Sequence, residues 1–249
     1  MDVNELNKKV YCIAGCKVRF AANFRRLHWM CRDYAVSEEP ELELTITKDD
    51  IEFERKKTLE EEKTEGIPHQ EFRPSYYEAT AACRKLTEKL LEDDIILFHG
   101  SAVAVDGQCY LFTAKSGTGK STHTKLWREL LGDRAVMIND DKPLLRVTDR
   151  NVTVYGTPWN GKHHLGTNGS APLRALCILE RGEKNEIHPV TSAEAMPMLL
   201  QQCNRTADPA KAIHTLDLIG TLAESVNLYR LHCNMDPEAA KVAFEAMHP

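Results

Sequence analysis

Short apolar runs separated by turn residues dominate the first third of the chain. Residues 10–13 and 17–20 are short strand-like runs, and residues 41–47 alternate strictly between polar and apolar side chains. A period of two is typical of a half-buried β-strand. Residues 55–66 follow, dense in Lys and Glu, and we interpret them as a solvated loop or edge ribbon. The pattern predicts a small β-rich unit over residues 1–72.

From residue 73 onward, the pattern alternates between a helical period and buried strands. Apolar residues recur at helical spacing over residues 75–92. Residues 95–105 are an apolar run typical of a buried strand. Asp106-Gly107 is a strong hairpin signal, which predicts that the chain returns in a second strand over residues 109–113.

The rest of the chain repeats this alternation. We predict strands over residues 134–138, 152–155, 174–179 and 227–233. We predict helices over residues 122–131, 192–202, 210–226 and 237–247. Strands and helices that alternate in this way favour a mixed α/β fold. We therefore expect two domains, with the boundary between residues 72 and 73.

Composition and charge narrow the class of protein. The sequence has 249 residues, with 32 Lys and Arg against 37 Asp and Glu, and thus a formal net charge of −5. An acidic balance argues against a general binder of nucleic acid or of an anionic membrane surface. No run approaches the roughly 18 consecutive apolar residues of a transmembrane helix. The first residues lack the basic and then apolar order of a secretory signal, so we expect a cytoplasmic protein.

The cysteines also favour a cytoplasmic protein. Eight are scattered along the sequence, and no two have the CxxC spacing that zinc sites usually contain. We interpret them as free thiols, which are typical of a reducing compartment.

The most informative segment is a glycine-rich loop over residues 114–122, between a predicted strand and a predicted helix. Its sequence is Ala-Lys-Ser-Gly-Thr-Gly-Lys-Ser-Thr. In this context, consecutive backbone N–H groups and the helix N-terminus can hold phosphate oxygens, and glycine lets the backbone approach them closely. The expected nucleotide-binding residues are Ser116, Gly117, Thr118, Gly119, Lys120, Ser121 and Thr122. Ala114 stands where the motif usually begins with glycine.

Two of these residues carry specific chemistry. The Lys120 ammonium would contact the β- and γ-phosphates of ATP, and the Ser121 hydroxyl would bind Mg²⁺. Downstream, the strand predicted over residues 134–138 leads into Asp140 and Asp141. Carboxylates at such a strand end can hold the metal and accept a proton from an attacking hydroxyl. The alternative is that the two aspartates only form a turn.

The order of these motifs resembles that of HPr kinase/phosphorylase, specifically its C-terminal catalytic domain. A strand leads to His99-Gly100, a hairpin follows, and then come SGTGKS, a helix, a strand and the Asp pair; Lys120 lies 21 residues after His99. SGTGKST and the Asp pair are also similar to the ATP-binding motifs of phosphoenolpyruvate carboxykinase. The resemblance covers roughly residues 95–180. It implies a P-loop nucleotide-binding fold of this kind.

The resemblance also implies roles for individual residues. Lys120 would contact phosphate, while Ser121 and Asp141 would hold Mg²⁺. Asp140 would be the general base toward an acceptor hydroxyl, and His99 would lie near the Asp pair and the γ-phosphate. For His99, the alternative is a hydrogen-bonded histidine of a buried strand. The related kinases form oligomers, and the oligomeric state of this chain stays open.

A loop over residues 156–170 contains four glycines, Trp159, Lys162 and the adjacent His163 and His164. Functional loops are often built this way on a rigid sheet. Lys162 could neutralise a transferring phosphoryl group or hold an acidic acceptor, and Trp159 could cover the site. The two histidines would bind a metal only if a third ligand converged on them.

Three functions are compatible with these motifs. We expect an ATP- and Mg²⁺-dependent phosphotransferase that moves the γ-phosphoryl group to a hydroxyl of a small molecule or to a Ser of a peptide or protein. The main alternative is a nucleotide-switched ATP-binding partner of a peptide-modification or regulatory system, with little or no transfer activity. Carboxykinase-type chemistry on a small acid is disfavoured, because the chain lacks the length and recognisable ligands for a second metal.

Overall fold

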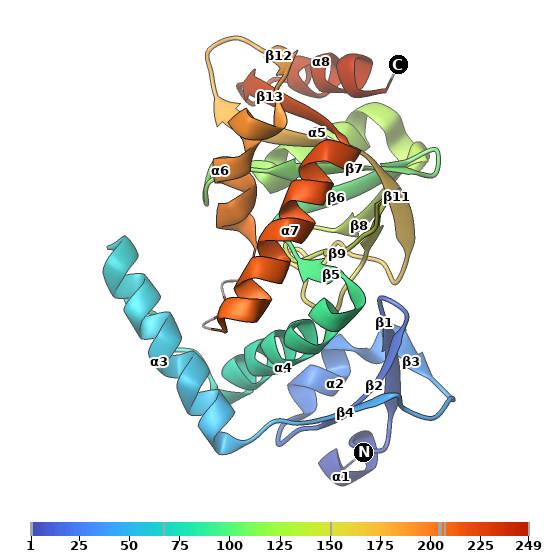
Figure 1. The fold of residues 1–249 in the computed structure, drawn as a ribbon, viewed down its shortest axis with the longest axis vertical. Coiled ribbons are helices and arrows are strands. Elements are labelled where there is room, and N and C mark those ends of the chain that lie inside the picture. Colours follow the sequence, from blue (N-terminus) through green and yellow to red (C-terminus); the bar gives the residue numbers. More distant parts are fainter. Residues whose placement is uncertain (1, 67, 150, 204–205, 207, 249) are drawn as a thin grey trace. The chain divides into compact units, whose positions relative to one another are not determined.

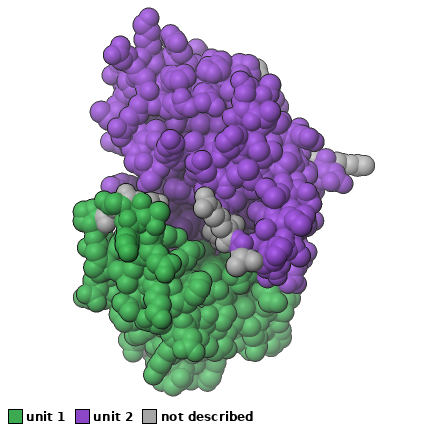
Figure 2. Space-filling model, turned by 60° about the vertical axis from the view of Figure 1, so that its left-hand side comes forward, with its two compact units in different colours: residues 1–90 green, residues 91–249 purple. Residues whose placement is uncertain are grey.

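The computed structural model describes residues 2–66, 68–149, 151–203, 206 and 208–248. The chain forms two compact units, Met1–Leu90 and Leu91–Pro249, which are coloured separately in Figure 2. Each unit contains a β-sheet and helices, so the predicted mixed α/β class is confirmed. In the part of the chain that is described, no helix combines the length and the apolar character needed to cross a membrane.

Unit 1 contains a four-stranded sheet in the order β3-β1-β2-β4. The strands are β1 (Val10–Ile13), β2 (Cys16–Ala21), β3 (Ala35–Val36) and β4 (Leu42–Thr45). Strands β1 and β2 form an antiparallel hairpin, whose turn residues Ala14 and Gly15 have φ values of 51° and 84°. Strand β3 pairs with β1, and β4 runs parallel to β2. The strands expected in this region are therefore present.

Helices make up the rest of unit 1 (Figure 1). They are α1 (Val3–Leu6), α2 (Arg25–Met30), α3 (Lys48–Glu65) and α4 (Pro74–Leu90). The prediction of a loop or edge ribbon over residues 55–66 is wrong, because nearly all of that stretch belongs to α3. Helix α4 agrees with the helix expected over residues 75–92. Because α4 packs against α2 and α3, the chain divides after Leu90, whereas the sequence pattern suggested a division after residue 72.

Local interactions explain why the charged segment is helical. The Thr47 hydroxyl accepts the Asp50 N–H, and the Asp50 carboxylate accepts the Thr47 N–H, which is a reciprocal capping box. Along the helix, Glu52 pairs with Arg55, three residues further on. Such pairs stabilise a helix, although each contributes only a few tenths of a kcal/mol. Helix α3 needs a further interaction to hold it in place.

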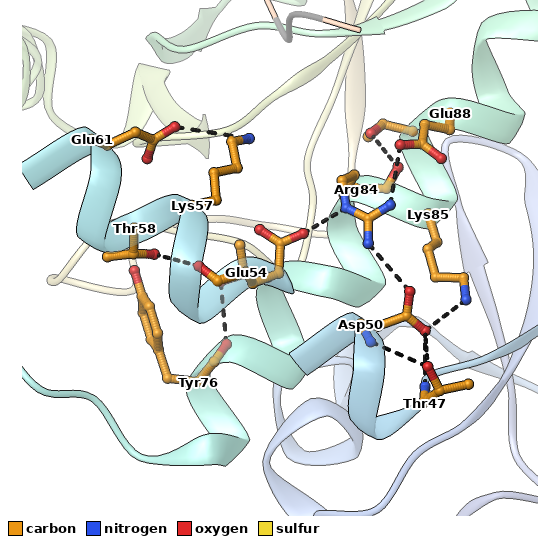
Figure 3. Close-up of polar contacts among 12 residues, drawn as sticks. Thr47, Asp50, Glu54, Lys57, Thr58, Glu61, Tyr76, Arg84, Lys85 and Glu88 are labelled. Atoms are coloured by element: carbon orange, nitrogen blue, oxygen red, sulfur yellow. Dashed lines mark hydrogen bonds and ion pairs between the residues drawn. The ribbon is translucent and has the colours of Figure 1, made fainter. Parts of the chain in front are cut away.

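That interaction is a charged network between α3 and α4 (Figure 3). Glu54 of α3 is only 2% exposed. Its carboxylate accepts a hydrogen bond of 2.5 Å from Nε of Arg84, on α4. The same guanidinium contacts Asp50 at 3.3 Å and Glu88 at 3.2 Å, and Lys85 adds a bond of 2.8 Å to Asp50. One arginine therefore compensates a buried carboxylate and joins the two helices.

We expect Arg84→Met to lower the free energy of unfolding of unit 1 by about 3 kcal/mol, because the substitution leaves the buried Glu54 carboxylate without its cation. Chemical denaturation followed by circular dichroism measures this loss. Arg55→Met is the matched control, since Arg55 pairs with Glu52 on the surface and its loss costs at most about 1 kcal/mol. Equal stability of the two variants would contradict this account of the network.

Unit 2 is built on a sheet that has nine strands among the described residues, with β5-β9-β10-β11-β7-β6-β8 as its main path. The strands of that path are β5 (Ile95–Leu97), β9 (Leu144–Val147), β10 (Val152–Tyr155), β11 (Ser170–Arg181), β7 (Gln108–Thr113), β6 (Ser101–Val105) and β8 (Ala135–Asn139). Strand β13 (Asn227–Cys233) runs parallel to β11 and also pairs with β12 (Glu186–Pro189). The run expected as one strand over residues 95–105 is thus two strands, interrupted at His99-Gly100.

Helices cover both faces of this sheet (Figure 1). Helices α5 (Lys120–Leu131) and α8 (Glu238–Met247) pack on one face, and α6 (Ser192–Gln202) and α7 (Pro209–Ser225) pack on the other. Along β7, Tyr110 and Phe112 pack in the core under α5 and α8, while Cys109 and Leu111 pack in the core under α6 and α7. Central strands buried on both faces are continuously apolar. This is why the sequence of β6 and β7 lacks polar alternation.

Candidate functional site

The glycine-rich loop connects the end of β7 to the start of α5. Gly117 and Gly119 have φ values of 74° and 125°, which side chains other than glycine rarely adopt. Helix α5 begins at Lys120, and its N-cap Gly119 provides no side chain to bond the first-turn N–H groups. Ser121 and Thr122 are exposed in that first turn. The loop thus presents backbone donors and the positive end of a 12-residue helix.

Ala114 occupies the first position of the loop without strain. It is fully buried and does not have a positive φ. Alanine in place of glycine therefore has no conformational cost here. The Ala114 carbonyl accepts a hydrogen bond of 3.4 Å from the Lys120 ammonium. Burial lowers the pKa of Lys120, and the negative charge of Asp141 opposes that shift. The charges of Lys120 and Asp141 therefore favour each other.

Helix α5 is fixed under the loop by aromatic contacts. Trp127 is fully buried, and its indole N–H donates to Nε2 of His123 at 3.1 Å. The His123 ring packs edge-on against Phe112 of β7, with 4.7 Å between ring centroids. These contacts hold the first two turns of the helix against the strand that precedes the loop.

The Asp pair follows β8 in a tight turn that Asn139 organises. The Asn139 side-chain oxygen accepts the N–H groups of Asp141 at 2.8 Å and Lys142 at 2.7 Å. Its amide nitrogen donates to Thr157, both to the carbonyl and to the hydroxyl. The Thr157 hydroxyl in turn donates to the Lys142 carbonyl at 2.8 Å. Asn139 therefore joins this turn to the start of the loop over residues 156–170.

Asp140 points inward from this turn. It is 4% exposed, and its Oδ1 accepts the Gly161 N–H at 2.6 Å. Its Oδ2 is buried and has no hydrogen-bond partner among the described residues. Space beside Gly161 is tight, because an added Cβ would lie 3.0 Å from that Oδ2. Asp140 thus carries an unused acceptor oxygen, the kind of group that would receive a proton or a donor from a ligand.

Asp141 and His99 form the neighbouring pair. Nε2 of His99 lies 3.4 Å from Oδ1 of Asp141, and both side chains are partly exposed. Burial alone would raise the pKa of Asp141, but the His99 hydrogen bond and the positive charges of Lys142 and Lys120 hold it below its usual value. Asp141 is therefore an ionised carboxylate at neutral pH, as a metal ligand must be.

Backbone and hydroxyl contacts join His99, the Asp pair and the strand before the glycine-rich loop. The Gly100 N–H donates to the Asp141 carbonyl at 3.0 Å, and the Ser101 hydroxyl donates to the Asp140 carbonyl at 3.1 Å. The Thr113 hydroxyl donates to the His99 carbonyl at 3.1 Å. Thr113 is the last residue of β7, directly before the loop. The structure therefore brings together three of the sequence motifs: His99, Asp140-Asp141 and the start of the loop.

The loop over residues 156–170 lies between β10 and β11, as expected, and has anchored ends. The Gly156 N–H donates to the Gly169 carbonyl at 2.9 Å, and the Thr167 N–H donates to the Ile138 carbonyl at 3.2 Å. Lys162 is exposed just after Gly161, and among the described residues no hydrogen bond or ion pair joins it to the Asp pair. Trp159 is buried and therefore does not present its ring for stacking on a base. His163 and His164 are exposed.

Several site residues were missed by the sequence analysis. Asn139, Thr157 and Gly161 orient the Asp pair, and Arg181 contacts the glycine-rich loop. Asn139 lies directly before the Asp pair, and Thr157 and Gly161 lie in the loop over residues 156–170, but the sequence alone does not show that these residues touch the pair. Hydrogen bonds of that loop bring Thr157 and Gly161 to the site, and the pairing of β11 with β7 brings Arg181.

The residues present fit a magnesium–nucleotide complex. Within the described parts of the chain, no three His, Cys, Asp or Glu side chains gather as a metal site by themselves. Mg²⁺ does not need such a cluster, because it is usually held by one or two carboxylates together with substrate phosphates. The ionised Asp141 carboxylate and the exposed Ser121 hydroxyl provide oxygen ligands of the suitable type.

Comparison with known proteins shows distant similarity to solved structures. Neither a protein-family model nor a curated protein matches the sequence. Among solved structures, the fold is similar to "Structure of the Hpr(Ser) kinase/phosphatase from Coxiella burnetii", with a TM-score of 0.34 and 8% sequence identity. The match covers 60% of this chain and 95% of the other.

We expect the stability of unit 2 to fall as the pH is lowered, because of His123. Burial lowers the pKa of this histidine to about 4. In the unfolded chain the pKa of a histidine is near 6.5, so between pH 6.5 and pH 4 the unfolded state binds a proton and the folded state does not. The contribution of His123 to the free energy of unfolding is therefore complete above pH 6.5 and decreases as the pH falls toward 4. By pH 4, the loss reaches about 3 kcal/mol.

Denaturation of wild type and His123→Gln at pH 7 and pH 4 measures this contribution. The variant should lose less stability than the wild type over this interval, whereas His163→Gln, at an exposed position of the same unit, should behave as the wild type. An unchanged pH dependence in His123→Gln would show that His123 does not carry the effect.

Proposed function

We propose that this chain is an HPr-kinase-like phosphotransferase that binds ATP and Mg²⁺ through a P-loop over residues 114–122. It transfers the terminal phosphoryl group to a hydroxyl of a small molecule or to a Ser of a peptide or protein. The observation that carries the proposal is the hydrogen-bonded connection of Thr113, His99 and the Asp pair at the edge of the sheet where the glycine-rich loop begins.

The loop supplies the phosphate site. The uncapped first turn of α5 offers N–H groups to anionic oxygens, and the positive φ of Gly117 and Gly119 shapes the loop around them. Lys120 adds a positive charge for the β- and γ-phosphates. The Ser121 hydroxyl and the Asp141 carboxylate would hold Mg²⁺. Bound there with the nucleotide, this ion would offset the negative charge of the phosphates.

Asp140 is suited to act as the general base. Its Oδ1 is held by the Gly161 N–H, which fixes the orientation of the carboxylate, and its Oδ2 has no partner among the described residues. An acceptor hydroxyl donating to Oδ2 would give its proton to this oxygen as it attacks the phosphoryl group. His99 would hold Asp141 through their contact at 3.4 Å and add a polar group beside the transferring phosphoryl. Lys162, on the exposed loop, would approach the acceptor when it binds.

The first experiment tests for transfer directly. ATP labelled at the γ-phosphate is incubated with Mg²⁺, the protein and a fractionated lysate, and label is followed into small-molecule, peptide and protein fractions. We expect label to enter one fraction and to be lost with Lys120→Met. Lys125→Met on the exposed side of α5 is the control and should transfer as the wild type. The same variant pair in a binding assay should show a loss of roughly 10- to 100-fold in ATP affinity for Lys120→Met only.

A second experiment tests the base. Asp140→Asn should lower the transfer rate by about 10²–10⁴-fold, because the amide cannot accept the proton. Its affinity for ATP should stay within about threefold, since Asn retains an oxygen for the Gly161 N–H. Asp133→Asn, on the exposed turn before β8, is the control for removal of a carboxylate. Transfer by Asp140→Asn at the wild-type rate would remove Asp140 from the mechanism.

The hydrogen bond between Asp140 and Gly161 also favours a second function. It links the Asp pair to the loop over residues 156–170, so a ligand that competes for the Asp140 carboxylate would release that loop. A nucleotide-switched binding module would use this link to present the loop to a partner. Tight ATP binding without label in any fraction, together with ATP-dependent protease cleavage within the loop, would favour the switch over the enzyme.

A further inference from the structure

Arg181 is the last residue of β11, the longest strand of unit 2. Strands β11 and β7 are parallel and paired, with Ile178 opposite Thr113. The carboxyl ends of parallel strands meet at the same edge of a sheet. The chain of β7 enters the glycine-rich loop after Thr113, and β11 continues alongside for three residues to Arg181. The strand alignment therefore places Arg181 beside the loop.

The Arg181 side chain contacts the loop itself. Its Nη2 donates to the Gly117 carbonyl at 2.7 Å. Gly117 has a φ of 74°, so its peptide unit takes an orientation that most residues do not reach. A charged donor on this carbonyl stabilises that orientation, because charge-assisted hydrogen bonds are about twice as strong as neutral ones. Arg181 thus helps to fix the shape of the loop.

The backbone that carries Arg181 is held on its other side. Arg181 lies opposite Cys233 of β13, and the Gly182 N–H donates to the Cys233 carbonyl at 3.0 Å. Gly182 has little space, because an added Cβ would lie 3.0 Å from Cβ of His232. The side chain therefore extends from a paired strand rather than from a freely moving loop.

The charge of Arg181 is uncompensated within the described part of the chain. No carboxylate there lies within 4.0 Å of its guanidinium, whereas the adjacent Glu180 is paired with Arg230. A guanidinium has five N–H donors, and the structure records a bond from one of its nitrogens, to Gly117. An unpaired guanidinium beside a phosphate-type loop matches the charge and geometry of a polyphosphate.

We propose that Arg181 is a positioning residue for the nucleotide, and that it favours a nucleoside triphosphate over a diphosphate. It holds the Gly117 peptide and adds a positive charge at the loop, so the more highly charged ligand gains more from it. This inference rests on the proposed function, because it requires that the loop binds a nucleotide.

The test compares binding of ADP and of a non-hydrolysable ATP analogue, each with Mg²⁺, by calorimetry on the full chain. The variants are Arg181→Met, which removes the charge and the donors, and Arg181→Lys, which retains a charge. Lys184→Met removes an exposed cation from the following turn and is the matched control. Thermal unfolding of each variant monitors the fold, which an exposed strand-end residue should not disturb.

We expect Arg181→Met to weaken binding of the ATP analogue by about tenfold and binding of ADP by less than about threefold. Arg181→Lys should recover most of the loss, and Lys184→Met should bind both ligands as the wild type. Unchanged affinities in Arg181→Met would overturn the inference. An equal loss of affinity for both ligands in Arg181→Met, without recovery in Arg181→Lys, would overturn it as well. Arg181 would then only support the shape of the loop and would not favour the triphosphate. Failure of the wild type to bind either ligand would instead refute the proposed function, and the inference with it.

Discussion

The candidate site depends on how the ends of three strands are joined at one edge of the sheet in unit 2. The Gly100 N–H and the Ser101 hydroxyl both bond the backbone of the Asp pair, and the Thr113 hydroxyl bonds the His99 carbonyl. These hydrogen bonds connect segments that are far apart in the sequence. Because β6, nearly all of β7 and the last three residues of β8 are buried, these segments cannot shift independently. A rigid, water-poor sheet thereby fixes polar groups whose chemistry needs accurate placement.

Buried charge is treated differently in the two units. In unit 1, the Glu54 carboxylate is fully compensated by Arg84, and Glu78 at 0% exposure accepts three hydrogen bonds from Asn23 and Phe24. In unit 2, Asp140 is nearly as buried, but only one of its oxygens is bonded among the described residues. A carboxylate whose oxygens are all bonded joins structural elements. A carboxylate with one unbonded oxygen can still accept a hydrogen bond from a ligand, and that bond would stabilise the complex. This contrast is why we propose a ligand-binding role for Asp140 and not for Glu54 or Glu78.

Much of the fold was predictable because its signals are local. The periods of apolar residues gave the central strands, the hairpin at Asp106-Gly107 and α4, and the motif SGTGKST gave the loop between β7 and α5. Helix α3 was missed because its charged composition outweighed the capping box of Thr47 and Asp50, whose effect is local but small. Arg181, Thr157 and Gly161 could not be predicted from spacing, because strand register and loop packing bring them to the site. Sequence patterns predict individual helices and strands well, but contacts between them can be identified only once the strand pairing is known.

The loop over residues 156–170 has a fixed neck and a less restricted tip. At Gly156, an added Cβ would lie 1.8 Å from the Thr167 carbonyl oxygen, so the two ends of the loop approach too closely for any other residue. Residues 162–164 at the tip are exposed, and no such steric limit applies to them. Mutation during evolution can therefore alter the length and chemistry of the tip while the neck keeps Asp140 and its neighbours in place. Under the proposed function, such changes at the tip would alter the choice of acceptor without altering the glycine-rich loop.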